Sequence, residues 1–404
     1  MAGIDLEAVR QAAQHLRGVV YQTPLQEFQE INDLLGGRIF FKLENLQRTG
    51  SFKIRGAYYR LCHLSEGERK AGVVAASAGN HGQGVALAAD LVGTHSVVFM
   101  PEGASLPKVQ ATRRWGAEVR LEGETFDDAQ AAALAYAEAT GAAFIPAFDD
   151  PLVIAGQGTV GLELLDQRPD LGRVVVPVGG GGLIAGIAIA LKERYPHLRV
   201  VGVQAEGAAA MVASRQAGHP VEIPRVHTIA DGIGVRRPGR LTTEIVLRYV
   251  DDLVTVQDHD ISRAILFFLE RTKLVVEGAG AVGLAAFLAG KLPVEERPTA
   301  VVVSGGNIDV TLLARIIEHG LVEEGRQVRL STVLGDRPGQ LARLLRLVAE
   351  AKANVLRVEH ERWSPALEPN QSEVELVLET RDRDHAEGLV AKLEEAGYDV
   401  RRRA

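Results

Sequence analysis

Cysteine is almost absent from this sequence, since Cys62 is the only one among 404 residues. A single thiol cannot form an internal disulfide, which fits a reducing compartment such as the cytoplasm. Cys62 lies among aromatic and aliphatic residues, so a place in the core is a better interpretation than a nucleophile. Long apolar runs are also lacking. None approaches the length of a membrane span, and residues 1–18 mix charged with apolar residues, unlike a signal peptide.

Positive charge is not in excess. Lysine and arginine number 45 against 52 aspartate and glutamate residues, which gives a net charge of −7. This balance argues against a nucleic-acid-binding chain, and the terminal run 401–403 is better explained as a solvated tail. Hydrophobic residues make up 46% and charged residues 24%, which is typical of a globular protein, and the length suits two or three domains.

Glycine, by contrast, is abundant, with 43 residues that cluster at particular places. From about residue 70 to residue 310, short β-branched runs alternate with stretches rich in alanine, leucine and glutamate. The β-branched runs are 72–77, 95–100, 117–122, 173–180, 199–206 and 299–306. This alternation predicts an α/β fold with helices on both faces of parallel sheets. Ligands of such folds bind at the carboxyl ends of the strands, where this sequence places its small residues.

The character of the sequence changes at about residues 323–327. The segments expected after this point are strand 327–335, helix 338–353, strand 354–363, strand 372–380, helix 383–396 and a last short strand. Their order, βαββαβ, is that of a ferredoxin-like unit. We therefore predict a larger domain over residues 1–323 and a second domain over residues 327–404.

Four consecutive glycines, Gly179–Gly182, join an apolar strand to a helix that starts near Leu183. Such a junction lets backbone N–H groups approach an anion, and the helix N-terminus adds partial positive charge. A Walker lysine is lacking, because Lys192 lies well inside the helix, and the glycines do not follow the GxGxxG order. A small phosphate monoester is thus favoured over a nucleotide. The plainer alternative is a tight turn, but four glycines cost backbone entropy.

Two further strand ends carry polar residues. The segment SAGNHGQG, 77–84, places Ser77, Asn80 and His81 between a strand and a helix, where side chains point at ligands. Helix capping, the alternative, needs fewer polar groups than these. The segment SGGN, 304–307, follows another apolar strand and is weak evidence by itself.

Lys53 lies in the segment TGSFKIRG, 49–56. Taken alone, it would be interpreted as a solvated surface lysine. A lysine together with a phosphate cradle and polar loops predicts a pyridoxal phosphate site, where the lysine forms a Schiff base and the cofactor acts as an electron sink.

The segments SFKIRG, SAGNHGQG, GGGGLIAG and SGGN stand in the order found in the threonine/serine dehydratases. Over residues 5–320 the sequence resembles this family of fold type II, tryptophan-synthase-β-like pyridoxal phosphate enzymes. The resemblance implies a two-lobed fold, with a small lobe at about 48–150 inserted in the large lobe. It implies conversion of L-threonine to 2-oxobutanoate and ammonia, with L-serine as a further substrate. The tail, with DRPGQL at 336–341, resembles an ACT regulatory domain.

The resemblance also implies roles for single residues. Lys53 would hold pyridoxal phosphate covalently, and Phe52 would lie against its ring. Asn80 would hydrogen-bond the ring 3-hydroxyl, and Ser304 would meet the pyridine nitrogen. The phosphate would be bound by the N–H groups of Gly179, Gly180, Gly181, Gly182 and Leu183. The substrate carboxylate would be surrounded by Ser77, Asn80 and His81.

Several residues bear on the type of reaction. Ser304 cannot keep the ring nitrogen protonated as a carboxylate would, and the weaker electron sink favours β-elimination over transamination or racemisation. Lys53 is expected to take the α-proton as general base. The related serine racemases carry a serine where this chain has Ala78, so racemisation is disfavoured. Some relatives bind a divalent cation, and Glu206 matches one of its ligands. Val212 stands where an acid is needed, so we expect this metal site to be incomplete, with a monovalent ion or none.

Substrate preference and regulation are left open by the sequence. Threonine and serine differ by one methyl group, worth about 1–3 kcal/mol, and the segment 148–159 is expected to line that region. The ACT-like tail favours threonine, isoleucine biosynthesis, and control by an amino-acid effector such as isoleucine or valine. Asp336 and Gly339 are candidate effector-binding residues, although Asp336 and Pro338 also suit a plain helix cap. A homodimer or homotetramer is expected.

Other functions fit part of the pattern. A β-replacement synthase would share the lysine and the glycine loop, and a serine dehydratase or racemase-like enzyme would share nearly all of it. A non-catalytic amino-acid sensor, with the tail as its working part, would not need the lysine and the phosphate loop.

Overall fold

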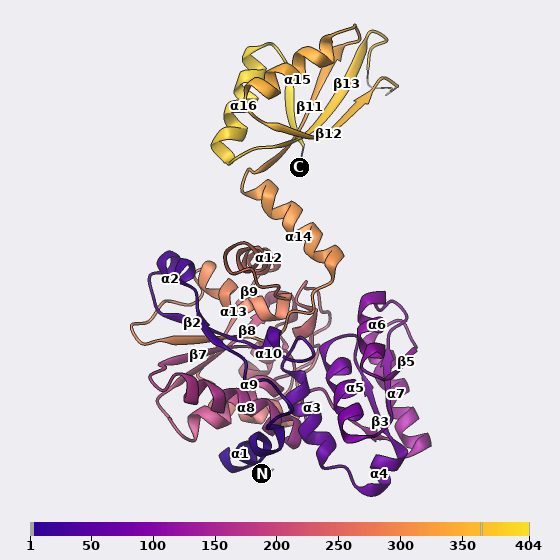
Figure 1. Cartoon of the computed structure of the whole chain (residues 1–404), viewed down its shortest axis with the longest axis vertical. Helices are drawn as coiled ribbons and strands as arrows, with labels where there is room; N and C mark the ends of the chain where they lie inside the picture. The colour runs from indigo at the N-terminus through magenta and orange to yellow at the C-terminus, as the bar shows by residue number, and fades with distance from the viewer. Residues whose placement is uncertain (1–3, 364, 366, 404) are drawn as a thin grey trace. The chain divides into compact units, whose positions relative to one another are not determined.

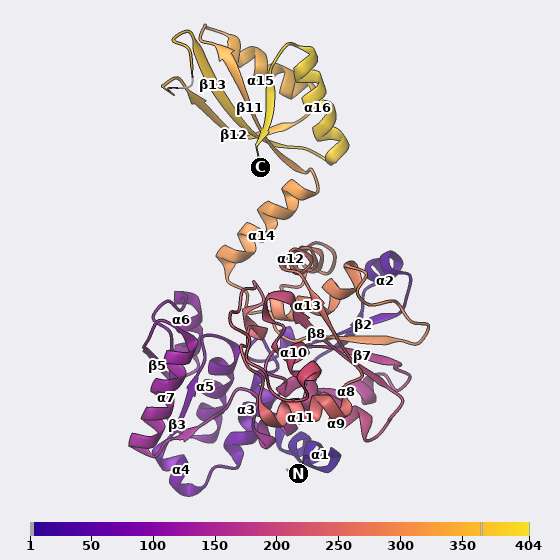
Figure 2. The ribbon, with the colours of Figure 1, turned by 180° about the vertical axis from the view of Figure 1, so that it is seen from behind.

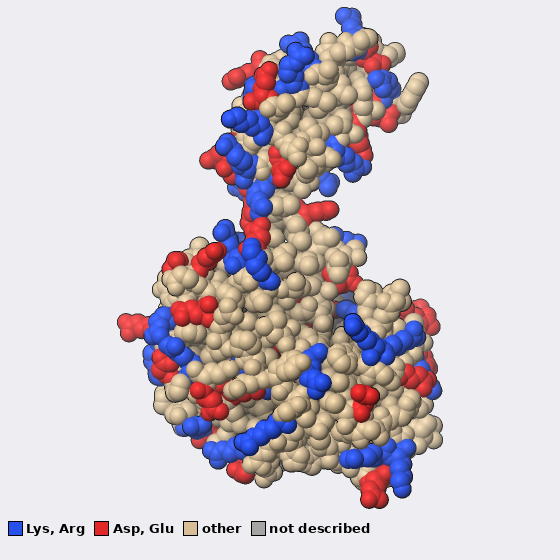
Figure 3. Space-filling view, in the orientation of Figure 1, with Lys and Arg blue, Asp and Glu red and all other residues tan. Residues whose placement is uncertain are grey.

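The computed structural model describes residues 4–363, 365 and 367–403. The chain forms two compact units, residues 1–309 and 310–404. Helix α14 (Val310–Glu323) groups with the second unit, where it packs against β11 (Gln327–Gly335), whereas the change in sequence character follows this helix. Acidic and basic side chains are interspersed over the face shown in Figure 3. Within the described residues, no helix combines the length and the apolar character that crossing a bilayer requires.

The larger unit contains two sheets, seen from opposite sides in Figures 1 and 2. The first has the strand order β1-β2-β10-β7-β8-β9, and its neighbours are parallel except for the β1–β2 pair. Its strands are β1 (Leu25–Glu27), β2 (Ile39–Leu43), β7 (Arg173–Pro177), β8 (Arg199–Ala205), β9 (Asp252–Val256) and β10 (Thr299–Val303). Strands β7 and β10 are buried along their whole length. Apart from Arg173 and Thr299 at their starts, both are apolar runs that do not alternate with polar residues, as expected for strands covered on both faces.

The second sheet is parallel throughout, with the order β5-β4-β3-β6. Its strands are β3 (Val73–Ala76), β4 (Ser96–Met100), β5 (Glu118–Leu121) and β6 (Ala143–Phe144). The two sheets form a large and a small lobe, and in both of them polar or glycine-rich loops follow the carboxyl ends of the strands.

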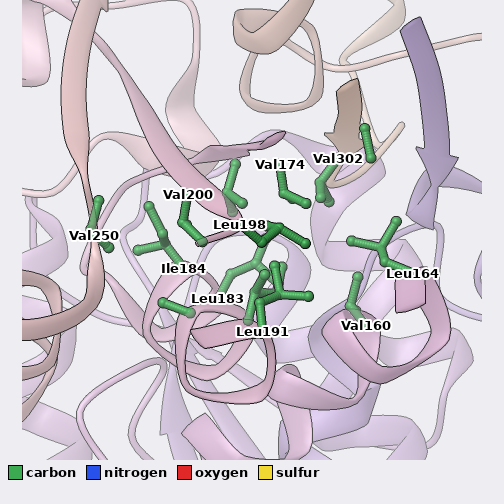
Figure 4. Packing of buried hydrophobic residues seen from close by; sticks show 14 of the residues in the cluster. Val160, Leu164, Val174, Leu183, Ile184, Leu191, Leu198, Val200, Val250 and Val302 are labelled. Atoms are coloured by element: carbon green, nitrogen blue, oxygen red, sulfur yellow. The ribbon is translucent and has the colours of Figure 1, made fainter. Parts of the chain in front are cut away.

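Helices connect and cover both sheets. They are α1 (Leu6–Leu16), α2 (Gln29–Leu35), α3 (Lys53–Cys62), α4 (Glu66–Ala71), α5 (Asn80–Val92), α6 (Leu106–Arg114), α7 (Phe126–Thr140), α8 (Pro151–Gln167), α9 (Gly182–Lys192), α10 (Ala210–Ala217), α11 (Arg240–Tyr249), α12 (Asp258–Phe267) and α13 (Gly278–Leu288). Helix α9 is apolar on all sides because it is buried between the sheet and α8. Its Leu183, Ile184 and Leu191 pack with Leu164 and Val174 in the core of the large lobe (Figure 4).

Helix α3, which begins at Lys53, is fixed by buried contacts on two sides. A Cβ atom on Gly156 of α8 would lie 2.6 Å from Gly56 Cα, so the two helices touch through their backbones. Arg55 is buried and donates from Nε and Nη2 to the Glu44 carboxylate at 2.8 and 2.7 Å. It also donates to Glu163 at 2.6 Å. Burial makes each of these charges costly to leave unpaired, so the ion pairs hold the start of α3 in one place.

The second unit has one antiparallel sheet, with the order β12-β13-β11-β14. Its further elements are α15 (Gln340–Glu350), β12 (Asn354–Glu361), β13 (Gln371–Glu379), α16 (Arg383–Glu395) and β14 (Val400–Arg403). Helices α15 and α16 pack on one face of the sheet, where Leu344, Val348 and Leu389 meet the strands. From β11 onward the order is βαββαβ, which confirms the ferredoxin-like arrangement predicted from the sequence.

Candidate active site

A cavity of about 1010 Å³ lies at the carboxyl ends of strands β3, β7 and β10, between the two lobes of the larger unit. Every single residue to which the resemblance gave a cofactor or substrate role lines it. These residues are Phe52, Lys53, Ser77, Asn80, His81, Gly179, Gly180, Gly181, Gly182, Leu183 and Ser304. The loops converge because parallel strands present their carboxyl ends at the same edge of a sheet.

Lys53 is the first residue of α3, and its Nζ donates to the carbonyl oxygen of Ala147 at 3.0 Å. The residue is half-buried, but its amine lies deep in the cavity. Burial lowers the pKa of Lys53 to about 8, against the opposing effect of the nearby Glu277 carboxylate. An amine with this pKa is more readily deprotonated near neutral pH than a surface lysine.

The four-glycine loop is packed closely against Met211 and Phe148. Gly181 has a φ of +96°, which favours glycine, and a Cβ atom there would lie 2.6 Å from Met211 Cε. A Cβ atom on Gly180 would lie 2.3 Å from the ring of Phe148. Helix α9 begins at Gly182, and its first turn leaves N–H groups without intrahelical partners. The loop therefore has no room for side chains, and the unpaired N–H groups at the start of α9 are chemically suited to a phosphate group.

The loop before α5 carries Ser77, Asn80 and His81. The Ser77 hydroxyl accepts from the N–H of Gly79 at 3.1 Å. His81 Nε2 donates to the Ile145 carbonyl oxygen at 2.8 Å, which assigns the proton of the neutral ring to this nitrogen. Burial, together with the charge of Lys53, lowers the pKa of His81 to about 3. His81 is therefore neutral near pH 7 and offers hydrogen bonding without charge.

The segment 304–307 is bound to the segment that precedes Lys53. The Phe52 N–H donates to the carbonyl oxygen of Ser304 at 3.2 Å, and Ser51 pairs with Gly305 in an antiparallel bridge. Asn307 Nδ2 donates to the carbonyl oxygen of Thr49 at 2.7 Å. The lysine loop and the Ser304 loop thus form one structural unit.

Glu277 and Asn307 also line the cavity, and the sequence analysis missed both as site residues. Glu277 accepts a hydrogen bond from Asn80 Nδ2 at 2.7 Å, and Asn307 Nδ2 donates to Asn80 Oδ1 at 2.7 Å. Burial and then the charge of Asp231 raise the pKa of Glu277 to about 7. For Glu277 the sequence signal was a lone acid between an apolar run and an alanine- and glycine-rich helix, whereas Asn307 is the last residue of the SGGN segment.

The segment 148–159 was expected to line the substrate region, but most of it does not line the cavity. Within the segment 148–159, only Phe148 and Asp149 line the cavity, because α8 begins at Pro151 and carries the other residues away from it.

Asp336 and Gly339 lie in the second unit. The Asp336 carboxylate is paired with Arg362 Nε at 3.1 Å, and Gly339 precedes α15 with a φ of +90°. Among the described residues, no group of three His, Cys, Asp or Glu side chains is placed to hold a metal ion.

A protein-family model described as pyridoxal-phosphate dependent enzyme matches residues 16–305. The chain belongs to this family. The pyridoxal-phosphate dependence predicted from the sequence is thereby confirmed, and the lysine and the glycine cradle in one cavity fit that cofactor. The resemblance to the threonine/serine dehydratases is confirmed by named relatives.

One relative of this pyridoxal-phosphate dependent enzyme is the L-threonine ammonia-lyase of Thermotoga maritima. It is 51% identical over 398 residues, which cover 98% of this chain and 99% of the relative, so the match includes the second unit. Among solved structures, the processed form of threonine deaminase isoform 2 from Solanum lycopersicum is 38% identical with a TM-score of 0.73, covering 77% of this chain and 87% of the other. Maize serine racemase is 35% identical with a TM-score of 0.74, covering 80% and 99%. The predicted α/β fold of fold type II enzymes is confirmed.

Proposed function

We propose that this chain is an L-threonine ammonia-lyase. It removes water from L-threonine by β-elimination, and hydrolysis of the product gives 2-oxobutanoate and ammonia. L-Serine, which differs by one methyl group, is a further substrate. The observation that carries the proposal is the convergence of the Lys53 amine, the glycine cradle and the Ser304 loop on one cavity. The relatives named L-threonine ammonia-lyase support the choice of substrate.

Pyridoxal phosphate, when bound, withdraws electrons from the bonds at the substrate α-carbon and so makes the α-proton acidic. Lys53 is the residue that holds the cofactor and then takes this proton on Nζ as general base. Its lowered pKa, about 8, suits a base that works near neutral pH. No second amine is needed to remove the α-proton.

The remaining residues bind and orient the cofactor and the substrate. The N–H groups of the loop from Gly179 to Leu183 would hold the phosphate, and Phe52 would lie against the ring. The Ser304 hydroxyl would meet the ring nitrogen, and Asn80 would meet the ring 3-oxygen. The substrate carboxylate lies at the N-terminus of α5, with Ser77, Asn80 and neutral His81 around it. Since His81 carries no charge, the partial positive charge of the 13-residue helix α5 supplies the attraction.

Elimination is favoured over racemisation. Racemisation needs a second acid or base on the opposite face of the substrate, and Ala78, which lines the cavity in the Ser77 loop, has no proton to give. This side chain supports a lyase, although serine racemases share the fold.

For the second unit we propose an ACT-type regulatory role. An amino-acid effector, isoleucine or valine, would bind at the turn before α15, with Asp336 for its ammonium group and the backbone at Gly339 for its carboxylate. Asp336 would have to exchange its ion pair with Arg362 for the effector. Such control suits the first step of isoleucine biosynthesis, carried out by a homodimer or homotetramer in the cytoplasm.

The test compares wild type, Lys53→Ala and Lys70→Ala in the visible absorbance of bound cofactor and in 2-oxobutanoate release from L-threonine. Lys70 is an exposed lysine on α4 and serves as the matched control. We expect Lys53→Ala to abolish turnover and Lys70→Ala to keep it. A wild type that holds the cofactor but leaves threonine untouched would refute the proposal. Adding isoleucine or valine to the same assay, beside Asp336→Ala, tests the regulatory part.

A further inference from the structure

Three side-chain and backbone groups form a closed triangle at the edge of the cavity. Asn307 Nδ2 donates to Asn80 Oδ1, and Asn80 Nδ2 donates to the Glu277 carboxylate, each at 2.7 Å. The backbone N–H of Asn307 closes the triangle by donating to the same carboxylate. The three residues come from the start of α5, the residue before α13, and the loop after β10, so the triangle joins both lobes.

Glu277 decides the orientation of the Asn80 amide. The carboxylate accepts hydrogen bonds only, so the NH₂ side of the amide must face it. The reversed amide would place two oxygens together at Glu277 and two NH₂ groups together at Asn307. Asn307 cannot adapt by turning its own amide to offer an acceptor, because its Nδ2 also donates to the carbonyl oxygen of Thr49 at 2.7 Å. In the observed orientation Asn80 keeps one N–H for a ligand in the cavity.

The site is shaped around this carboxylate. A Cβ atom on Gly305 would lie 2.3 Å from Glu277 Oε1, so any side chain at that position would displace it. The charged groups that face Glu277 are Asp231 from the 3-10 turn at 231–233, Lys108 from α6 and Lys53 from α3. Asp231 and Lys108 are ion-paired to each other, which weakens the net effect of both. Helix α13 itself contributes no titratable side chain.

We propose that Glu277 is a positioning residue for the cofactor, whose carboxylate fixes the Asn80 amide with its remaining N–H available to the ring 3-oxygen. The inference rests on the proposed function. Protonation of Glu277 turns it into a donor that also accepts the reversed amide. Only Asn307 then opposes the reversal, so the Asn80 amide is held most firmly while Glu277 is ionised. Because burial raises the pKa of Glu277 to about 7, this change falls near neutral pH.

The experiment titrates the visible absorbance of the holoenzyme between pH 6 and pH 8. Wild type is compared with Glu277→Gln, Glu277→Ala and Asp231→Asn, and with Glu244→Gln as an exposed control for the same chemical change. Wild type should show a transition near pH 7. Glu277→Gln keeps an acceptor oxygen for Asn80 but cannot ionise, so it should hold the cofactor without the transition. Glu277→Ala should lose the cofactor on dialysis about ten- to a hundredfold more readily, the equivalent of one hydrogen bond to a charged group.

Asp231→Asn keeps the test valid if the Glu277 variants fail to fold. Removing Asp231 takes away a negative charge and frees Lys108, and both changes should move the transition to lower pH. Two results would overturn the inference: a wild type without the transition, or Glu277→Gln titrating as wild type does. A holoenzyme that shows the transition but releases no 2-oxobutanoate would refute the proposed substrate and leave the role of Glu277 standing.

Discussion

Replacing Gly181 with alanine tests the glycine loop as a phosphate cradle. Gly181 has a φ of +96°, so an alanine there is strained by its backbone, at a cost of about 1–2 kcal/mol. Its Cβ atom would also lie 2.6 Å from Met211 Cε and 2.9 Å from Thr242 Cβ. Met211 can give way, but Thr242 is held by its hydrogen bond to the Gly180 carbonyl oxygen at 2.7 Å. Overpacking of this kind adds about 1–3 kcal/mol. We expect a total loss of about 2–5 kcal/mol in the free energy of unfolding.

The matched control is Gly218→Ala. Gly218 follows α10 with a φ of +76°, and a Cβ atom there would meet nothing within 4 Å, so only the backbone cost applies. Urea denaturation of both variants separates the two contributions. Since the Gly181 strain is relieved by moving the loop, Gly181→Ala should also retain the cofactor less well on dialysis, by about tenfold for each 1.4 kcal/mol. Equal losses of stability in the two variants, with equal cofactor retention, would refute the cradle.

Two further predictions concern buried charges. Arg55→Met should lower the free energy of unfolding by about 3–5 kcal/mol, because it leaves Glu44 ionised and buried without its cation. Denaturant unfolding measures this loss, with Arg10→Met as a surface control. Equal losses of stability in the two variants would contradict the prediction. The raised pKa of Glu277 makes the cofactor-free protein lose stability as pH rises from about 4.5 to about 7, since the folded state favours the protonated form. In the same window Glu277→Gln should gain up to about 3 kcal/mol relative to wild type, and a difference that does not vary with pH would show that Glu277 does not titrate there.

Much of the site could be predicted from the sequence because strand ends carry its residues. Lys53, the Ser77 loop, the glycine loop and Ser304 each follow a local pattern, and parallel strands bring such loops to one edge. The pairing of Asn80 with Glu277 has no local pattern, since the two residues are 197 positions apart. A lone acid near a glycine-rich helix is also consistent with an ordinary surface residue.

The boundary between the units shows a different limit. Composition changes after α14, which is why the sequence analysis divided the chain at 323–327. The structure groups α14 with the second unit because the helix packs against β11. Composition records what a segment is made of, whereas grouping depends on which neighbour it contacts. Sequence reasoning therefore located the second fold but not the helix that accompanies it.

The position of the Lys53 amine is set by the backbone more than by contacts of its side chain. A Cβ atom on Gly84 of α5 would lie 3.0 Å from the carbonyl carbon of Lys53, so α5 presses directly on the lysine backbone. Gly156 does the same to Gly56 from α8, and Phe52 is bound to Ser304. With the backbone fixed from three sides, only the four-carbon arm can move. If Lys53 first holds the cofactor and then serves as general base, as proposed, its freed amine would therefore stay close enough to take the α-proton of the substrate.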